Sequence, residues 1–176
     1  VVIDPRRTET AERADLHVAV APDGDVALFN ALLAELHARG QVDRDFVDRN
    51  CTASADFFDR LDASTPGVPA KTFAALADLV AAHPRMVTLF SQGANQSRSG
   101  TDKGNAIINL HLATGRINAP GMGPFSITGQ PNAMGGREVG GLANLLSAHR
   151  DLANPQHRAE VAALWGVADV PATPGK

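Results

Sequence analysis

The sequence predicts an α/β domain with a largely parallel, Rossmann-like sheet and flanking helices. Three observations support this fold class. Short apolar runs at residues 1–3 and 86–91 contain β-branched side chains, as buried strands do. A polar loop follows each run, and amphipathic helical patterns come after these loops. Strands that alternate with helices are typical of a parallel sheet covered by helices.

The first unit of the pattern is strand, loop, strand, helix. Asp4 and Pro5 end the first strand, and residues 16–22, "LHVAVAP", alternate enough to predict a second one. A helix then begins near Asp25, the candidate N-cap, and ends at Gly40. Its apolar stripe consists of Val26, Phe29, Leu32, Leu33 and Leu36.

The middle of the chain predicts a second strand–loop–helix unit. An amphipathic helix around residues 73–80 ends before Pro84, and the strand "MVTLFS" follows at residues 86–91. The polar loop "QGANQSRSG" comes next, and then a helix over residues 101–115 that is apolar on most sides. We expect this helix to be buried between layers, with His111 hydrogen-bonded inside it.

A glycine-rich stretch dominates the last third of the chain. Residues 123–141, "GPFSITGQPNAMGGREVGG", hold six of the 16 glycines and predict one long functional loop. Residues 142–148 and 157–165 then predict helices, with Trp165 in the core.

Composition limits the class of protein. The 176 residues are about one domain's worth, so we expect a single α/β domain, and the opening strand without an initiator Met predicts an excerpt from a longer, multidomain chain. A net charge of −3 gives no electrostatic case for nucleic acid or an anionic membrane. Cys51 is the one cysteine, which excludes an internal disulfide and fits a reducing, cytoplasmic setting.

Charged side chains follow two of the predicted strands. Asp4 is placed to hold ribose hydroxyls, or simply to begin a turn. Arg6 beside it is suited to phosphate, or is a solvated surface charge. In "PDGD", residues 22–25, Asp25 either caps the helix or accepts the paired N–H donors of guanine.

Amides and a fixed cation complete the candidate set. Gln92 and Gln96 lie in a loop without a general base, so they are suited to orienting a ligand. In the glycine-rich stretch, Gln130 and Arg137 stand among residues that permit close approach to an anionic ligand. The six histidines show no metal-ligand spacing, and neither Ser97 nor Ser126 predicts a hydrolase triad. The residues therefore predict a binding domain for a polar, nucleotide-like anion.

Several motifs together closely resemble the molybdopterin oxidoreductases. "DPRRT" is shared across that superfamily, whereas "NQS..GTDK.NAI.NLHL.TG" and "GPFS.TGQPNAMGGREVGG" resemble its bacterial assimilatory nitrate reductase branch. The resemblance runs over essentially all of the chain.

The resemblance implies a molybdenum centre carried on two molybdopterin guanine dinucleotides. Asp4, Arg6 and Thr8 would lie along one dinucleotide, and Asp25, with Asp23 beside it, would receive the guanine edge. Gln92 and Gln96 match positions near the pterin and the metal. Gln130 and Arg137 match the mouth of the substrate pocket, where Arg137 would attract nitrate.

The implied reaction is reduction of nitrate to nitrite. Electrons would come from a donor protein or subunit through a 4Fe-4S cluster that the missing N-terminal part of the polypeptide binds. The cysteines that ligate the cluster and the molybdenum are absent, and Cys51 is not assigned to either, so no metal ligand is predicted here. The C-terminal cofactor-binding region is absent too, and we expect this segment alone to be inactive.

One departure and two alternatives remain. Gln92 stands where the family usually has Met. The alternatives are a segment of another molybdenum enzyme, such as a formate dehydrogenase-like oxidoreductase, and a stand-alone guanine-nucleotide-binding module without catalysis.

Overall fold

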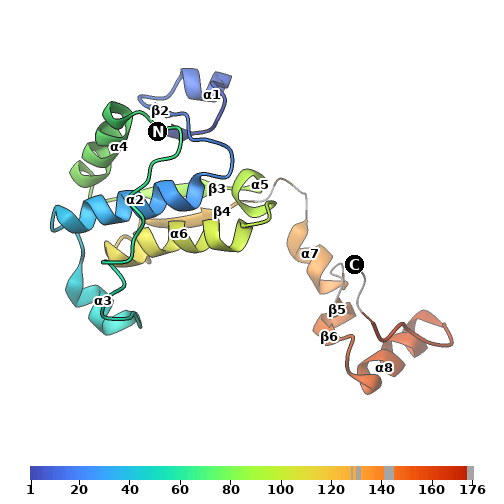
Figure 1. Cartoon of the computed structure of the whole chain (residues 1–176). Helices are drawn as coiled ribbons and strands as arrows, with labels where there is room; N and C mark the ends of the chain where they lie inside the picture. Colours follow the sequence, from blue (N-terminus) through green and yellow to red (C-terminus); the bar gives the residue numbers. More distant parts are fainter. Residues whose placement is uncertain (128, 130–131, 141–144, 174–176) are drawn as a thin grey trace. The chain divides into compact units, whose positions relative to one another are not determined.

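The computed structural model describes residues 1–127, 129, 132–140 and 145–173, which form two compact units (Figure 1). The first unit comprises residues 1–127 and the second residues 128–176. Because the two units are separate bodies, each is described by itself.

A short parallel strand pair opens the first unit. β1 (Val2–Ile3) pairs with β2 (His17–Val18), and α1 (Glu9–Glu12) lies between them in the chain. The predicted second strand is shorter than expected, because the Val20 N–H donates to the Val18 carbonyl at 3.0 Å and turns the chain. The strand-end loop therefore begins within the run "LHVAVAP".

Three helices supply most of the core of this unit. They are α2 (Asp25–Ala38), α4 (Ala70–Ala82) and α6 (Gly100–Ala113), and α3 (Arg44–Asn50) also packs against α6. The apolar stripe of α2 is buried as predicted at Phe29, Leu32, Leu33 and Leu36. Gly24 occupies the N-cap position of α2, so the prediction that Asp25 is the N-cap is wrong: Asp25 is the first helical residue.

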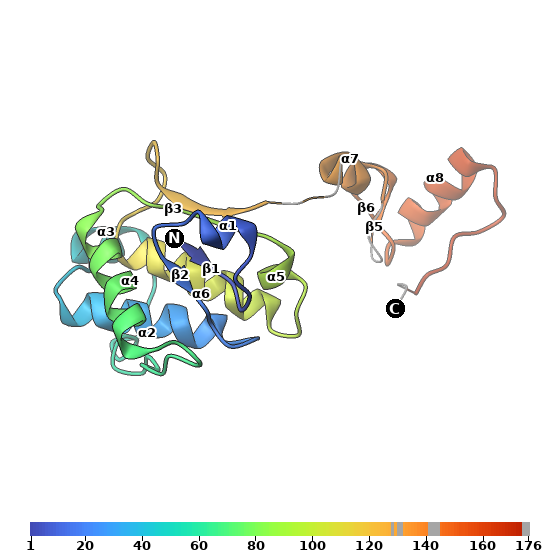
Figure 2. The ribbon, with the colours of Figure 1, turned by 90° about the horizontal axis from the view of Figure 1, so that it is seen from above.

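A β–α–β unit forms the other side of this body (Figure 2). β3 (Val87–Phe90) leads through α5 (Gln92–Asn95) and α6 to β4 (Gly123–Ser126), which pairs parallel to β3 with Val87 opposite Gly123. Met86 and Phe90 pack on the core, whereas Leu89 and Phe125 are 62% and 49% exposed. The sheet thus has one covered and one exposed apolar face within the described part of the unit.

The burial of α6 confirms the prediction for this helix. Leu110 and His111 have no exposed surface. The Nδ1 atom of His111 donates to the Arg116 carbonyl at 2.7 Å, so the Thr88 hydroxyl donates to Nε2 at 2.8 Å. Burial lowers the pKa of His111 and keeps the ring neutral. Asn105 on the same helix is exposed.

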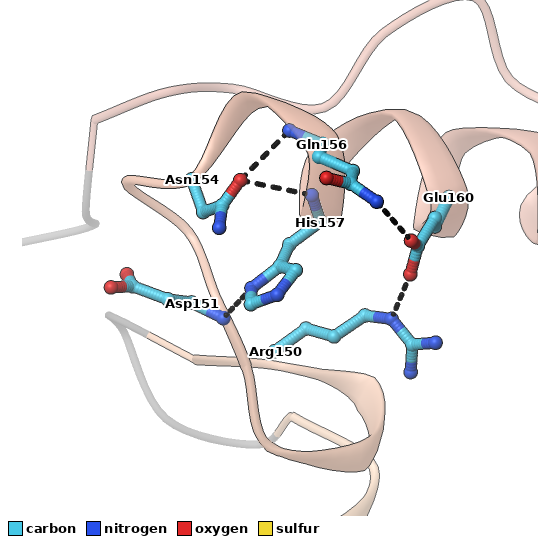
Figure 3. A network of polar contacts seen from close by, with 6 residues as sticks. All are labelled: Arg150, Asp151, Asn154, Gln156, His157 and Glu160. Carbon is cyan, nitrogen blue, oxygen red and sulfur yellow. Dashed lines mark hydrogen bonds and ion pairs between the residues drawn. The ribbon is translucent and has the colours of Figure 1, made fainter.

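The second unit contains α7 (Ala133–Glu138), β5 (Leu145–Leu146), the 3₁₀ turn η1 (Ser147–His149), β6 (Arg150–Asp151) and α8 (Pro155–Trp165). β5 and β6 are antiparallel. A network of polar contacts fixes the start of α8: Asn154 caps it, His157 accepts from the Asp151 N–H, and Arg150 pairs with Glu160 (Figure 3). The small core consists of Leu146, Leu152, Val161, Ala162 and Val170.

Three predictions for this part of the chain are wrong. Residues 123–141 are not one loop, because β4 takes up their start and Asn132 caps α7 within them. Residues 145–148 form β5 and part of η1 instead of a helix. Trp165 is 51% exposed, because it lies one turn beyond Val161 at the end of α8, past the small core.

The α/β fold class is confirmed, with small parallel sheets and flanking helices. In the described part of the chain, the helices are too short or too polar to cross a membrane.

We predict opposite effects from two alanine substitutions in α6. Gly104→Ala should raise the free energy of unfolding by about 0.5–1 kcal/mol, because Ala is the better helix former and its Cβ would meet no atom within 4 Å. Gly100→Ala should lower it, because its Cβ would collide with the Asn95 carbonyl oxygen. Urea unfolding of both variants measures the difference, and a Gly100→Ala variant as stable as Gly104→Ala would contradict this packing.

Candidate functional site

The candidate site is the edge of the first unit where its parallel strands end. The loop after β2 and the segment after β3 meet there, since Ser99 donates to Asp23 at 3.0 Å. The Asp4 N–H donates to the Val18 carbonyl at 3.2 Å, and this hydrogen bond keeps the loop after β1 beside β2. Parallel α/β sheets bind ligands at this edge.

The loop after β1 uses its polar side chains to fold locally. Asp4 Oδ1 accepts from the Arg6 N–H at 2.7 Å, which is the turn role considered for this residue. The Thr8 hydroxyl accepts from the Ala11 N–H at 3.3 Å and caps α1. The Arg6 side chain is exposed to solvent at the same turn. Ligand contacts by these three residues stay a prediction.

A buried ammonium group lies at the centre of the edge. Lys103 Nζ contacts Asp23 Oδ1 at 2.8 Å and Asp25 Oδ2 at 2.9 Å, and its side chain is 3% exposed. The carboxylates are more accessible, at 60% for Asp23 and 23% for Asp25. We refer to Asp23, Asp25 and Lys103 as the carboxylate cluster.

The cluster changes the pKa of two of its members. The Lys103 hydrogen bond, followed by that from Ser99, lowers the pKa of Asp23 below 3.8. Burial alone would lower the pKa of Lys103, but the hydrogen bonds that its ammonium group donates to Asp23 and Asp25 outweigh burial and raise this pKa. The cluster therefore holds one cation between two carboxylates and favours the ionised form of Asp23.

Sequence reasoning predicted the two aspartates and missed Lys103. A signal was present: Lys103 shares a helical face with Ile107 and Leu110, both fully or almost fully buried. A lysine on such a face needs an acidic partner. The sequence does not say which of the 19 acidic residues supplies it.

The loop after β3 presents amides to solvent. Gln92 begins α5, Gln96 is its C-cap, and both are exposed. Asn95 donates from Nδ2 to the Ser126 hydroxyl at 2.7 Å, which ties this loop to the end of β4. Both glutamines thus belong to the strand-end edge, and their ligand roles stay a prediction.

The two residues predicted at the substrate pocket belong to the other unit. Gln130 lies outside the described residues. Arg137 is exposed near the end of α7. Their roles stay predictions.

Two hollows in the surface of the first unit are separate from the predicted residues. One, of about 620 Å³, is lined by residues 117–120 and 122–125. The other, of about 430 Å³, includes Cys51 and Asn109. Across the described ranges, no group of three or more His, Cys, Asp or Glu side chains is close enough to hold a metal ion.

The chemistry of the strand-end edge is that of binding and orientation. Ionised carboxylates accept hydrogen bonds, amides both donate and accept, and an arginine is a fixed cation. This donor set fits a ligand with paired N–H donors, hydroxyls and phosphates. It fits a guanine nucleotide without supplying a nucleophile.

Comparison with known proteins decides the family. The family model described as molybdopterin oxidoreductase matches residues 1–176. The chain belongs to the molybdopterin oxidoreductase family. This confirms the resemblance seen in the motifs.

Several curated relatives of this molybdopterin oxidoreductase segment are nitrate reductases. The chain is 49% identical over 99% of its length to a nitrate reductase of Klebsiella oxytoca. It is 42% identical over 95% of its length to a nitrate reductase of Synechocystis sp. and to an assimilatory nitrate reductase of Haloferax mediterranei. The chain spans 20% of the first of these relatives and 24% of each of the other two.

We predict that Ser99 contributes to the ionisation of Asp23. Ser99→Ala removes the second-largest cause of the lowered pKa, so the pKa of Asp23 should rise part of the way towards 3.8. Carboxyl-detected NMR titration measures this value, with Asp62 as an internal control because its pKa is lowered by Ser64 instead. An unchanged Asp23 with an unchanged Asp62 would contradict the hydrogen bond.

Proposed function

We propose that the chain is a segment of a nitrate reductase that reduces nitrate to nitrite at a molybdenum bis(molybdopterin guanine dinucleotide) centre. The observation that carries this proposal is the 49% identity to a nitrate reductase over 99% of the chain. Identity at that level over the whole segment, with nitrate reductases also among the relatives at 42%, favours nitrate over formate as the substrate.

The segment's part in the proposal is to bind one end of the cofactor. The oxygens of the carboxylate cluster that Lys103 leaves free would accept the N1–H and N2–H donors of guanine. Arg6 would pair with a phosphate, and Asp4 would accept from a ribose hydroxyl through its second carboxylate oxygen. Gln92 and Gln96 would orient the pterin through their amides.

The reaction balances as nitrate plus two electrons and two protons, giving nitrite and water. The electrons and the acceptor for the oxygen atom would come from the molybdenum centre when it is bound. Arg137 would attract nitrate by its charge and orient it by hydrogen bonds, and Gln130 would add an amide at the same pocket.

The proposal requires partners beyond this segment. The rest of the polypeptide would supply the cluster and metal ligands, including the 4Fe-4S cluster, and a donor protein or subunit would deliver the electrons. We place the whole enzyme in the cytoplasm. An assimilatory nitrate reductase among the relatives and the single cysteine of this segment are both consistent with that location.

We predict that Arg137→Ala in the full-length enzyme raises the KM for nitrate roughly tenfold or more, because a hydrogen bond to a charged group contributes about 1.5–3 kcal/mol. Steady-state kinetics measures the change. Arg49→Ala is the matched control, since Arg49 is also an exposed arginine in the last turn of a short helix. Unchanged KM and kcat in Arg137→Ala would remove Arg137 from the substrate pocket.

A further inference from the structure

We propose that Lys103 determines the base selectivity of the nucleotide site, by engaging one oxygen of each carboxylate of Asp23 and Asp25 and leaving the other oxygen of each to accept hydrogen bonds from the base. The inference rests on the proposed binding of a guanine dinucleotide. It assigns to Lys103 the role of a positioning residue, because its ammonium group contacts the carboxylates and would not contact the base.

The geometry fixes the cation against both carboxylates. Lys103 Nζ lies 2.8 Å from Asp23 Oδ1 and 2.9 Å from Asp25 Oδ2, on a side chain that is 3% exposed. Helix α6 holds the lysine, since Ala106, Ile107 and Leu110 on the same helix are buried. A buried ammonium without these partners would be unstable, so the contacts hold the loop after β2 in place.

The same contacts divide the carboxylate oxygens into two sets. Lys103 engages Oδ1 of Asp23 and Oδ2 of Asp25, and Ser99 also donates to Oδ1 of Asp23. Oδ2 of Asp23 and Oδ1 of Asp25 have no hydrogen bond from the residues that the structure describes. These are the atoms available to a base, and Asp23 is the more accessible of the two residues at 60%.

Ionisation decides which base these oxygens can bind. A carboxylate offers two acceptors, which complement the N1–H and N2–H donors of guanine. A protonated carboxyl group offers one donor and one acceptor, which complement the N1 acceptor and N6–H donor of adenine. One proton on the cluster would therefore weaken guanine binding and permit adenine.

Lys103 keeps that proton away. Both carboxylates contact the same nitrogen atom, so they are close neighbours, and like charges at this distance would otherwise retain a proton. The charged groups that act on Asp23 are Lys103 from α6 and Arg98 from the segment before α6, and Asp25 at the start of α2 contacts the same Lys103 nitrogen. The hydrogen bond with Lys103 is the largest cause of the lowered pKa of Asp23, so it favours the ionised carboxylate. Without Lys103 the pKa of Asp23 should rise.

The test measures nucleotide selectivity in the full-length protein, produced in a host that cannot make the cofactor. Isothermal titration calorimetry between pH 5 and pH 8 gives the Kd of GDP and the Kd of ADP. We express the preference for GDP as the GDP-to-ADP ratio of affinities, which is the Kd of ADP divided by the Kd of GDP. The unaltered protein should prefer GDP with a nearly constant ratio over this range. Lys103→Met should bind GDP at least tenfold more weakly, with a ratio that falls further as the pH falls.

Two variants separate charge from structure. Lys103→Arg retains a cation and should restore most of the selectivity, which a purely structural role would not predict for a longer, branched side chain in a buried position. Lys71→Met, on the exposed surface of α4, should leave both Kd values unchanged.

The outcomes distinguish the two proposals. An unaltered protein with no preference for GDP would overturn the guanine site itself. A GDP preference that Lys103→Met leaves unchanged at every pH would overturn the role of Lys103 and keep the site. If Lys103→Met does not fold, Lys103→Arg and Ser99→Ala provide the test. The inference is overturned if Lys103→Arg loses its preference for GDP and the GDP-to-ADP ratio of Ser99→Ala is no more sensitive to pH than that of the unaltered protein.

Discussion

The contact of one buried ammonium group with two carboxylates is the interaction on which the strand-end edge depends. Removing a charged amine from water costs several kcal/mol unless ionic partners and hydrogen bonds replace the solvent. Asp23 and Asp25 are those partners for Lys103, and they lie at the end of the loop after β2 and at the first position of α2, about 80 positions earlier in the chain. The packing of α6 and the position of the loop after β2 are therefore coupled.

That coupling explains the unusual backbone of the loop. Asp23 has a left-handed conformation with φ of 66°, which Asp tolerates better than most residues. Gly24 follows in a space where a Cβ would lie 2.9 Å from the Ala21 carbonyl oxygen. The left-handed conformation of Asp23 and the missing side chain of Gly24 together allow both carboxylates to reach Lys103 Nζ.

The sequence predicts the parts of this molecule whose pattern is local. The apolar face of α6 is one example, because its burial follows from helical periodicity, and the position of strand β3 is another, because its apolar and β-branched run is local. The local pattern does not predict the role of Asp25. An Asp that caps a helix and an Asp that pairs with a distant lysine occupy the same position in the sequence. Trp165 shows the other limit, since an aromatic residue at a helix end is buried only if the core extends that far. The glycine-rich stretch misled for a similar reason, because Asn132 and its hydrogen bond to Gly135 allow a helix to form among glycines.

The sheet of β3 and β4 has a consequence for handling the protein. Parallel sheets are ordinarily covered on both faces, yet Leu89, Phe125 and Val87 are exposed on one face of this pair. Burying such an apolar surface lowers the free energy, and contact with a second molecule can bury it. The apparent molar mass of this segment in light scattering should therefore rise with concentration, and mild detergent rather than salt should reduce this association.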